Sequence, residues 1–261
     1  MPEFNLLNHR ELEVSPEQIG RNVEIRLIFM RHGEKDPINR ENGLLTERGK
    51  EQFQEFAEEE LGDPNRTLVC YGTEIPRTAQ SCLEALKTSG AQVKVYPEPL
   101  DELDMRIGEQ NQKDRKTRFS RAFLETMKGM PVGHNVRQYL GYGRQRPDPD
   151  TYSPQEFAGG VAKVILNYET KVGRITSGKK TDVLLVSHDF VLSSFIQEVL
   201  GEKFTAEHPT LEPAGYFEVL IKTDGQGQHS MEGVYQGRHF NFDPEVLKSF
   251  AQKYDQAESE N

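Results

Sequence analysis

Two arginines and two histidines of this chain stand where they could act together on a phosphate group. Arg31 and His32 directly follow one apolar run, Arg77 lies just beyond a second, and His188 follows a third. A neutral imidazole is a competent nucleophile at neutral pH, and guanidinium groups bind phosphate oxygens through their N–H donors. If these side chains meet, they form a site for phosphoryl transfer through a histidine, with the second histidine, in its protonated form, and the arginines holding the oxygens.

A carboxyl group would complete this chemistry, because the leaving oxygen needs a proton and the attacking water must lose one. Glu102 follows a fourth apolar segment, and we expect it to be the proton donor. Asp104 lies two residues further on and Asp189 directly follows His188, so both remain alternatives. Asp189 is also well placed to cap the helix that follows it, which would keep its carboxylate ionised.

The apolar runs that carry these polar residues predict strands of a parallel sheet covered by helices. They comprise residues 26–30, 67–71 and 183–186, and a shorter strand is predicted at 93–96. Open α/β sheets bind ligands at the carboxyl ends of their strands. The predicted strands therefore place the polar residues at one shared crevice.

Helix signals alternate with these strands. Thr46 is a plausible N-cap, Pro76 suits the first position of a helix, and Ser153 with Glu156 forms a capping box. Residues 216–240 predict an antiparallel edge hairpin. The alternation predicts an α/β fold: a three-layer α/β/α sandwich with a mainly parallel central sheet, a helical insertion and antiparallel edge strands.

The predicted organisation has three parts. Residues 1–22 form an N-terminal arm, residues 23–245 one α/β domain, and residues 246–261 an acidic C-terminal tail, expected to be a helix that frays into disorder. Residues 105–150 lose the strand–helix alternation and are interpreted as a basic, lid-like insertion within the domain.

The insertion is locally basic in an acidic protein. Residues 105–146 hold ten Lys or Arg against three acids. Such charge runs are often solvated helical excursions, but a basic lid also suits a phosphorylated substrate. On the second interpretation Arg115, Lys116, Arg118 and Arg121 would contact the body of the substrate.

Composition excludes several classes of function. The net charge is −10, from 32 basic and 42 acidic residues, which disfavours nucleic-acid binding. No apolar run reaches the length of a membrane span, and the first residues lack the layout of a signal peptide, so we expect a cytoplasmic protein with no membrane partner. Cys70 and Cys82 fall on a predicted strand and helix and are expected to be buried, without a disulfide.

Four segments resemble those of a known family. They are residues 31–34, 45–52, 73–81 and 186–188. In this order they resemble the histidine phosphatase superfamily, the phosphoglycerate-mutase-like proteins, over roughly residues 24–240.

This resemblance implies roles for individual residues. It implies that His32 is the phosphorylated nucleophile, that Arg31, Arg77 and His188 form the phosphate pocket, and that Glu102 is the proton donor. It also implies a parallel sheet between helices and no need for a metal or other cofactor.

Departures from the family bear on the subtype. Mutases of the family carry a Trp-Asn pair soon after the Arg-His-Gly motif, whereas this chain has no tryptophan and Asn39 falls one place later. Mutase activity is thereby disfavoured, and Asn39 is a candidate phosphate ligand. The His188-Asp189 pair imitates that of the acid-phosphatase and phytase branch, but members of that branch are usually much longer.

The prediction from sequence is a phosphatase that hydrolyses a phosphomonoester through a phosphohistidine on His32. Its substrate would be a phosphorylated small molecule or a phosphoprotein. A phosphoglycerate-type phosphomutase and a weakly catalytic protein that binds a phosphorylated ligand are the alternatives.

Overall fold

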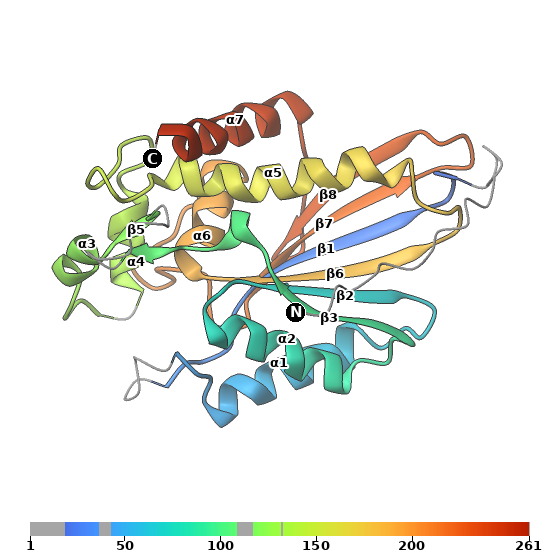
Figure 1. Cartoon of the computed structure of the whole chain (residues 1–261), viewed down its shortest axis with the longest axis horizontal. Coiled ribbons are helices and arrows are strands. Elements are labelled where there is room, and N and C mark those ends of the chain that lie inside the picture. Colours follow the sequence, from blue (N-terminus) through green and yellow to red (C-terminus); the bar gives the residue numbers. More distant parts are fainter. Residues whose placement is uncertain (1–18, 37–42, 109–116, 132, 261) are drawn as a thin grey trace, which may run out of the picture.

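The computed structural model of the chain describes residues 19–36, 43–108, 117–131 and 133–260, with a seven-stranded sheet at its centre (Figure 1). Its strands are β1 (Glu24–Arg31), β2 (Thr67–Gly72), β3 (Val93–Pro99), β6 (Lys180–Ser187), β7 (Tyr216–Thr223), β8 (His229–Tyr235) and β9 (Arg238–Asn241). They lie in the order β3-β2-β6-β1-β7-β8-β9. The first four are mutually parallel, and the last three run antiparallel to their neighbours. The predicted α/β fold with antiparallel edge strands is confirmed.

Helices cover both faces of the sheet, as predicted for a three-layer sandwich (Figure 1). One face carries α1 (Glu47–Glu60) and α2 (Pro76–Thr88), and the other carries α5 (Pro154–Val172), α6 (Asp189–Glu198) and α7 (Pro244–Glu260). Side chains alternate across a strand, so β1 serves both layers. Leu27 and Phe29 pack into the core beneath α5, α6 and α7, whereas Ile28 and Met30 pack into the core beneath α1 and α2.

The helix starts follow the predicted capping signals. The Thr46 side chain accepts the N–H of Gly49 at the start of α1. Ser153 and Glu156 form a complete capping box at the start of α5, and Pro76 opens α2. These caps satisfy backbone donors that the first turn of a helix leaves unpaired. No helix in the described part of the chain is both long and apolar enough to span a membrane.

The edge of the sheet differs from the prediction in one respect. The second strand of the predicted hairpin is divided into β8 and β9 by a turn at Gln236 and Gly237. Both turn residues have positive φ, of 50° and 73°, which is typical of tight hairpin turns. The sequence signal was weak because glutamine seldom adopts this conformation.

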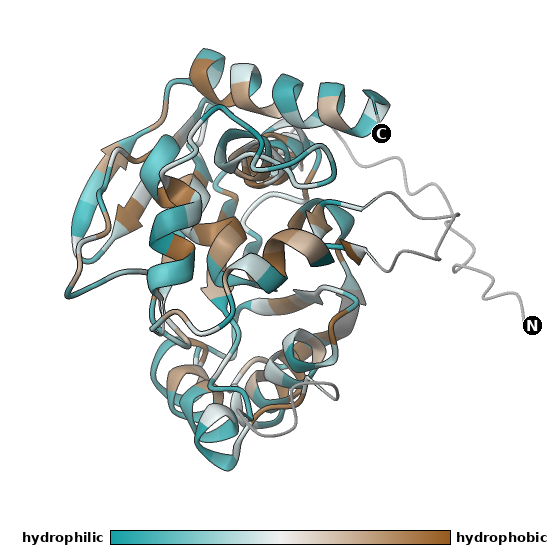
Figure 2. Cartoon of the chain, turned by 90° about the vertical axis from the view of Figure 1, so that its left-hand side faces the viewer, coloured by the Kyte–Doolittle hydropathy of each residue, from teal (hydrophilic) through white to brown (hydrophobic). Residues whose placement is uncertain are grey.

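The C-terminal segment is more ordered than its acidic composition suggests. The predicted helix does not fray after its start; α7 continues to Glu260 with five residues buried along one face: Leu247, Phe250, Ala251, Tyr254 and Ala257. In Figure 2, α7 alternates brown and teal turns towards the C-terminus, as expected of an amphipathic helix. The helix packs closely on α5, and only glycine fits at position 159 of α5. A Cβ at Gly159 would lie 2.3 Å from the Phe250 carbonyl oxygen.

The insertion lies at the end of the sheet where the parallel strands finish (Figure 1). After the short 3₁₀-helix η2 (Asp101–Leu103) come β4 (Ile107–Gly108), β5 (Phe119–Ser120), α3 (Arg121–Thr126) and α4 (His134–Leu140). β4 and β5 pair as a small parallel sheet separate from the main one.

Arg118 does not belong to a substrate-binding lid. Its side chain is fully buried, and its Nε and Nη2 donate at 2.6 Å to the carboxylate of Glu258 and the hydroxyl of Tyr254 in α7. Its Nη1 donates to the carbonyl oxygens of Asp101 and Asp104. The prediction for Arg118 was wrong because these partners consume its donors and exclude it from the surface. Arg118 instead ties α7 to the loop that holds the candidate acids.

The other residues assigned to the lid are less informative. Arg115 and Lys116 lie outside the described residues, and Arg121 is exposed and has an interaction partner.

We expect Arg118→Leu to destabilise the fold by about 3–5 kcal/mol, because it removes the buried guanidinium that bonds the partly buried Glu258 carboxylate, the Tyr254 hydroxyl and two backbone carbonyl oxygens. Urea unfolding followed by circular dichroism would measure the loss. Lys128→Leu is the matched control: Lys128 pairs with Glu125 at 2.5 Å, but both side chains are more than half exposed, so the loss should be below about 1 kcal/mol. Equal losses for the two variants would contradict a structural role for Arg118.

Candidate active site

The four side chains that the sequence predicts to act together lie at the end of the sheet where β1, β2 and β6 finish. The rings of His32 and His188 meet edge to face, with centroids 5.5 Å apart and planes at 61°. The Nη2 of Arg77 lies 3.4 Å from Nδ1 of His188. Arg31 pairs with Ser187 at the end of β1 and β6. The register of these two strands therefore brings the residues that follow them together.

His32 is followed by a position, Gly33, where packing requires glycine. A Cβ on Gly33 would lie 2.3 Å from the carbonyl oxygen of Gly49 at the start of α1. The Nδ1 of His32 lies 2.7 Å from the carbonyl oxygen of Gly33. A carbonyl oxygen only accepts hydrogen bonds, so Nδ1 carries the proton and Nε2 keeps its lone pair. Nε2 is thus the atom of His32 that can act as a nucleophile.

The charge state of His32 suits this role. Burial, assisted by the positive charges of Arg77 and Arg31, holds the pKa of His32 well below the usual value for histidine. The imidazole is therefore neutral near pH 7, and only the neutral form has a lone pair with which to attack phosphorus.

His188 is also buried and neutral. Its Nε2 lies 3.1 Å from the Thr73 hydroxyl, and its Nδ1 accepts from Arg77, which can only donate. Burial, followed by the positive charge of Arg77, holds the pKa of His188 well below its usual value. The sequence-based expectation of a protonated second histidine does not describe this state, because burial disfavours a charged imidazole and the neighbouring Arg77 disfavours a second positive charge.

The two arginines carry donors suited to an anion. Arg31 donates to the carboxylate of Asp189 at 2.9 Å and to the carbonyl oxygen of Leu211. The Nε atoms of Arg31 and Arg77 are both buried and lack a hydrogen-bond partner among the described residues. Buried donors are normally paired, and a phosphate oxygen is a strong acceptor for guanidinium N–H groups.

Asp189 holds Arg31 and does not cap a helix. The N-cap of α6 is His188, and Asp189 is the first helical residue. Burial favours the neutral form of Asp189, but the charges of Arg31 and Lys35, together with the hydrogen bond from the Phe190 N–H, outweigh it and hold the pKa of Asp189 below its usual value. Asp189 is therefore ionised near pH 7 and has no proton to donate.

The two remaining carboxyl groups lie in different surroundings. Asp104 is 4% exposed, and its oxygens accept the backbone N–H of Glu74 at 3.2 Å and of Arg106 at 3.0 Å. The charges that act on Arg77 are those of Asp189, Arg31 and Asp104. Glu102 is half-buried in η2, and its charge acts on Tyr254 in α7. Of the two, Asp104 is thus the carboxyl group that lies on the side of Arg77.

Two residues of the site were missed in the sequence. Lys35 is exposed, and its charge acts on both His188 and Asp189. The sequence could have indicated Lys35, because it is a basic residue three places after His32, at the rim of the predicted crevice. Thr73 gave no signal, since threonine is common at strand ends. Asn39, predicted as a phosphate ligand, lies outside the described residues.

The buried histidines predict how stability depends on pH. The folded chain keeps them neutral, whereas each binds a proton in the unfolded chain below its ordinary pKa of about 6.5. The unfolded state then binds more protons, so the free energy of unfolding should fall as pH drops below about 6.5, by up to about 1.4 kcal/mol per pH unit for each histidine. Urea unfolding at several pH values would measure it. His188→Asn should flatten this slope, and an unchanged slope would contradict a neutral, buried His188.

Comparison with known sequences identifies the family of the chain. Residues 27–232 match the family described as the histidine phosphatase superfamily (branch 1), so the chain belongs to that superfamily. No curated protein matches the chain in sequence.

Solved structures of similar fold include a protein described as mycobacterial hydrolase 2. It has 15% sequence identity and a TM-score of 0.50, and the match covers 88% of this chain and 97% of that one. A mycobacterial glucosyl-3-phosphoglycerate phosphatase has 16% identity and a TM-score of 0.49, over 82% of this chain and all of that one. The protein histidine phosphatase SixA has 14% identity and a TM-score of 0.39, over 85% of this chain and 99% of that one. At 15% identity, the likeness to mycobacterial hydrolase 2 concerns the fold alone.

Proposed function

We propose that this protein is a phosphatase that hydrolyses a phosphomonoester through a phosphohistidine on His32. The observation that carries the proposal is the neutral His32, whose proton is held on Nδ1, whose ring meets that of His188 edge to face, and on which the charges of Arg77 and Arg31 act. Arg31 and Arg77 would hold the non-bridging oxygens of the substrate. Family membership supports the same chemistry.

The reaction would proceed in two displacements. Nε2 of His32 attacks phosphorus while the bond to the leaving oxygen breaks, and that oxygen takes a proton from a carboxylic acid. Water then attacks the phosphohistidine, the carboxylate takes a proton from it, and the N–P bond breaks to release inorganic phosphate. His188 would take up a proton when the phosphate dianion binds, because added negative charge offsets the arginines that now keep it neutral.

The geometry favours Asp104 as the acid, with Glu102 as the alternative. Two backbone N–H groups hold the Asp104 carboxyl in one orientation on the side of Arg77. A fixed orientation matters because proton transfer requires the acid within hydrogen-bond reach of the leaving oxygen. The charge of Glu102 acts instead on α7, which lies behind this loop.

A turnover assay separates the phosphatase from its alternatives. The phosphatase should release phosphate from p-nitrophenyl phosphate without metal, and EDTA should not slow it. A mutase should need a phosphoglycerate and return its isomer, and a binding protein should bind vanadate without turnover. Metal-dependent hydrolysis blocked by EDTA would contradict the proposed mechanism.

The substrate would be a phosphorylated small molecule or a phosphoprotein. A screen over sugar phosphates, nucleotides and phosphopeptides, ranked by kcat/KM, would identify its class. Enzymes favour a substrate by binding its transition state, so the ranking by kcat/KM is the relevant one.

A further inference from the structure

The loop that carries the candidate acids is held by the C-terminal helix. We call residues 101–106, which include η2, the acid loop. In the last turn of α7, one carboxylate oxygen of Glu258 accepts from Nε of Arg118 at 2.6 Å and from the Tyr152 hydroxyl at 2.5 Å. The other oxygen lies 3.6 Å from Nη1 of Arg106. A single carboxylate of α7 therefore contacts two arginines, and one of them belongs to the acid loop.

Arg118 in turn holds the backbone of the acid loop. Its Nη1 donates to the carbonyl oxygens of Asp101 and Asp104, and its backbone N–H donates to the carbonyl oxygen of Arg106 at 3.0 Å. The side chain of Arg106 pairs with the carboxylate of Asp101. The first, fourth and last residues of the acid loop are therefore bound to one buried arginine, which the Glu258 carboxylate orients.

The last residue of the acid loop has a backbone conformation that needs such support. Arg106 has a φ of 41°, in the left-handed region that residues other than glycine seldom adopt. A conformation of this kind persists only where the surrounding structure enforces it. The Arg106 N–H in this conformation donates to the Asp104 carboxyl group at 3.0 Å. The contacts that hold Arg106 therefore also set the direction of the Asp104 carboxyl group.

The centre of the acid loop is held by other elements. The Ser187 hydroxyl at the end of β6 donates to the carbonyl oxygen of Leu103 at 2.7 Å, and Leu103 is fully buried. A Cβ at Gly160 in α5 would lie 2.3 Å from the carbonyl oxygen of Glu102, so α5 packs directly on the loop. Loss of the α7 carboxylate should therefore loosen the last residues of the loop and leave its centre in place.

We propose that Glu258 is a positioning residue for the reaction: through Arg118 and Arg106, it directs the Asp104 carboxyl group towards the leaving oxygen. The inference rests on the proposed function, because it concerns the proton transfer of that reaction. Proton transfer requires the acid within hydrogen-bond reach, and a misplacement of about 1 Å can slow a reaction by about 100-fold. Glu258 would thus contribute to the rate without contact with the substrate.

A double-mutant cycle tests whether Glu258 acts through Asp104. With an alkyl phosphate, Glu258→Ala should lower kcat by about 10- to 100-fold and leave KM within about twofold, because the phosphate-binding arginines stay in place. In the Asp104→Asn background, the same change should lower kcat by less than about twofold, since no acid is left to position. Equal losses of kcat in the two backgrounds would show a merely structural role and overturn the proposal.

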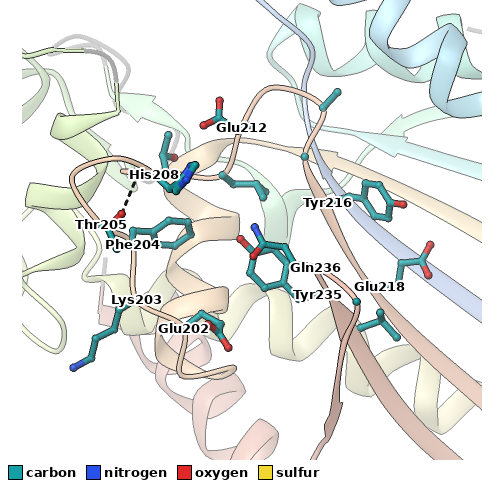
Figure 3. Close-up of a pocket in the computed structure, with 16 residues that line it drawn as sticks. Glu202, Lys203, Phe204, Thr205, His208, Glu212, Tyr216, Glu218, Tyr235 and Gln236 are labelled. Carbon is teal, nitrogen blue, oxygen red and sulfur yellow. Dashed lines mark hydrogen bonds between the residues drawn. The ribbon is translucent and has the colours of Figure 1, made fainter.

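Glu202→Ala is the matched control. Glu202 lies at the wall of a cavity of about 500 Å³ (Figure 3), which no residue of the acid loop lines. Like Glu258, it pairs with an arginine, and 26% of its side chain is exposed, against 23% for Glu258. Its removal should leave kcat unchanged. A melting curve checks the fold of each variant. If Glu258→Ala does not fold, Glu258→Gln keeps an acceptor oxygen for Arg118, and its expected loss of kcat is about threefold.

Amide hydrogen exchange tests the same contacts without turnover. In Glu258→Ala, the amide hydrogens of residues 104–108 should exchange about tenfold faster or more, because the loop opens more often, whereas Glu202→Ala should leave them unchanged. Unchanged exchange in Glu258→Ala would overturn the proposal. An inactive wild type in which Glu258→Ala still speeds exchange would count against the proposed phosphatase and leave the hold of α7 on the acid loop intact.

Discussion

Replacing His32 with alanine should lower turnover by about 100,000-fold or more, because no other group in the pocket can accept the phosphoryl group covalently. The Gly33 carbonyl oxygen holds the ring proton of His32 on Nδ1, so the Nε2 atom keeps its lone pair for the attack. Rapid-quench experiments on the wild type with a labelled phosphomonoester should trap an acid-labile phosphoprotein, and His32→Ala should trap none.

His188→Ala is the matched control for this result. Like His32, His188 is buried, and it lies beside Arg77. It would stabilise the negative charge of the transferring phosphoryl group and form no covalent bond to phosphorus. Its loss should slow turnover by about 100- to 1,000-fold and leave a labelled intermediate. If His188→Ala removes the label and His32→Ala keeps it, the roles of the two histidines are reversed.

Much of this site could be predicted from the sequence because each apolar run is followed at once by its polar residues. Arg31 and His32 follow β1, and His188 follows β6. Strands of this kind are parallel, and parallel strands end at one edge of the sheet. The local pattern therefore sufficed to bring the two histidines together.

Partners from distant parts of the chain could not be predicted in this way. Arg118 looks like one more surface charge in a basic segment, yet Glu258 and Tyr254, which bury it, lie 140 and 136 positions away. Asp189 stands where an N-cap is expected, but Arg31 lies close enough in space to bind its carboxylate. Local propensity cannot report an ion pair whose partner comes from another strand.

The C-terminal helix shows the opposite error. Its acidic composition suggested fraying, but apolar residues at helical spacing decided the outcome. Leu247, Phe250, Ala251 and Tyr254 form a continuous stripe that packs on α5. Burial of this stripe outweighs the repulsion among exposed acids, which water and salt screen.

Asp104→Asn should slow hydrolysis of an alkyl phosphate by about 100- to 10,000-fold, because an amide cannot donate a proton to the leaving alkoxide. Hydrolysis of p-nitrophenyl phosphate should fall much less, since nitrophenolate leaves without a proton. Comparing kcat/KM for the two substrates measures this dependence. The comparison controls for structural damage, because a misplaced loop would slow both substrates alike.

Two matched variants decide which carboxyl group is the acid. Glu102→Gln should change both substrates little if its charge serves only the α7 side of the loop. Asp189→Asn should slow hydrolysis of both substrates to a similar extent, because it frees Arg31 from the carboxylate that positions it.

Leaving-group dependence in Glu102→Gln, and not in Asp104→Asn, would assign the proton to Glu102. It would also mean that the loop rearranges when substrate binds, since the Asp104 carboxyl is the one now held beside Arg77. The same dependence in Asp189→Asn would mean that Asp189 donates the proton in the wild type. Asp189 would then have to bind a proton although the charges of Arg31 and Lys35 favour its ionised form.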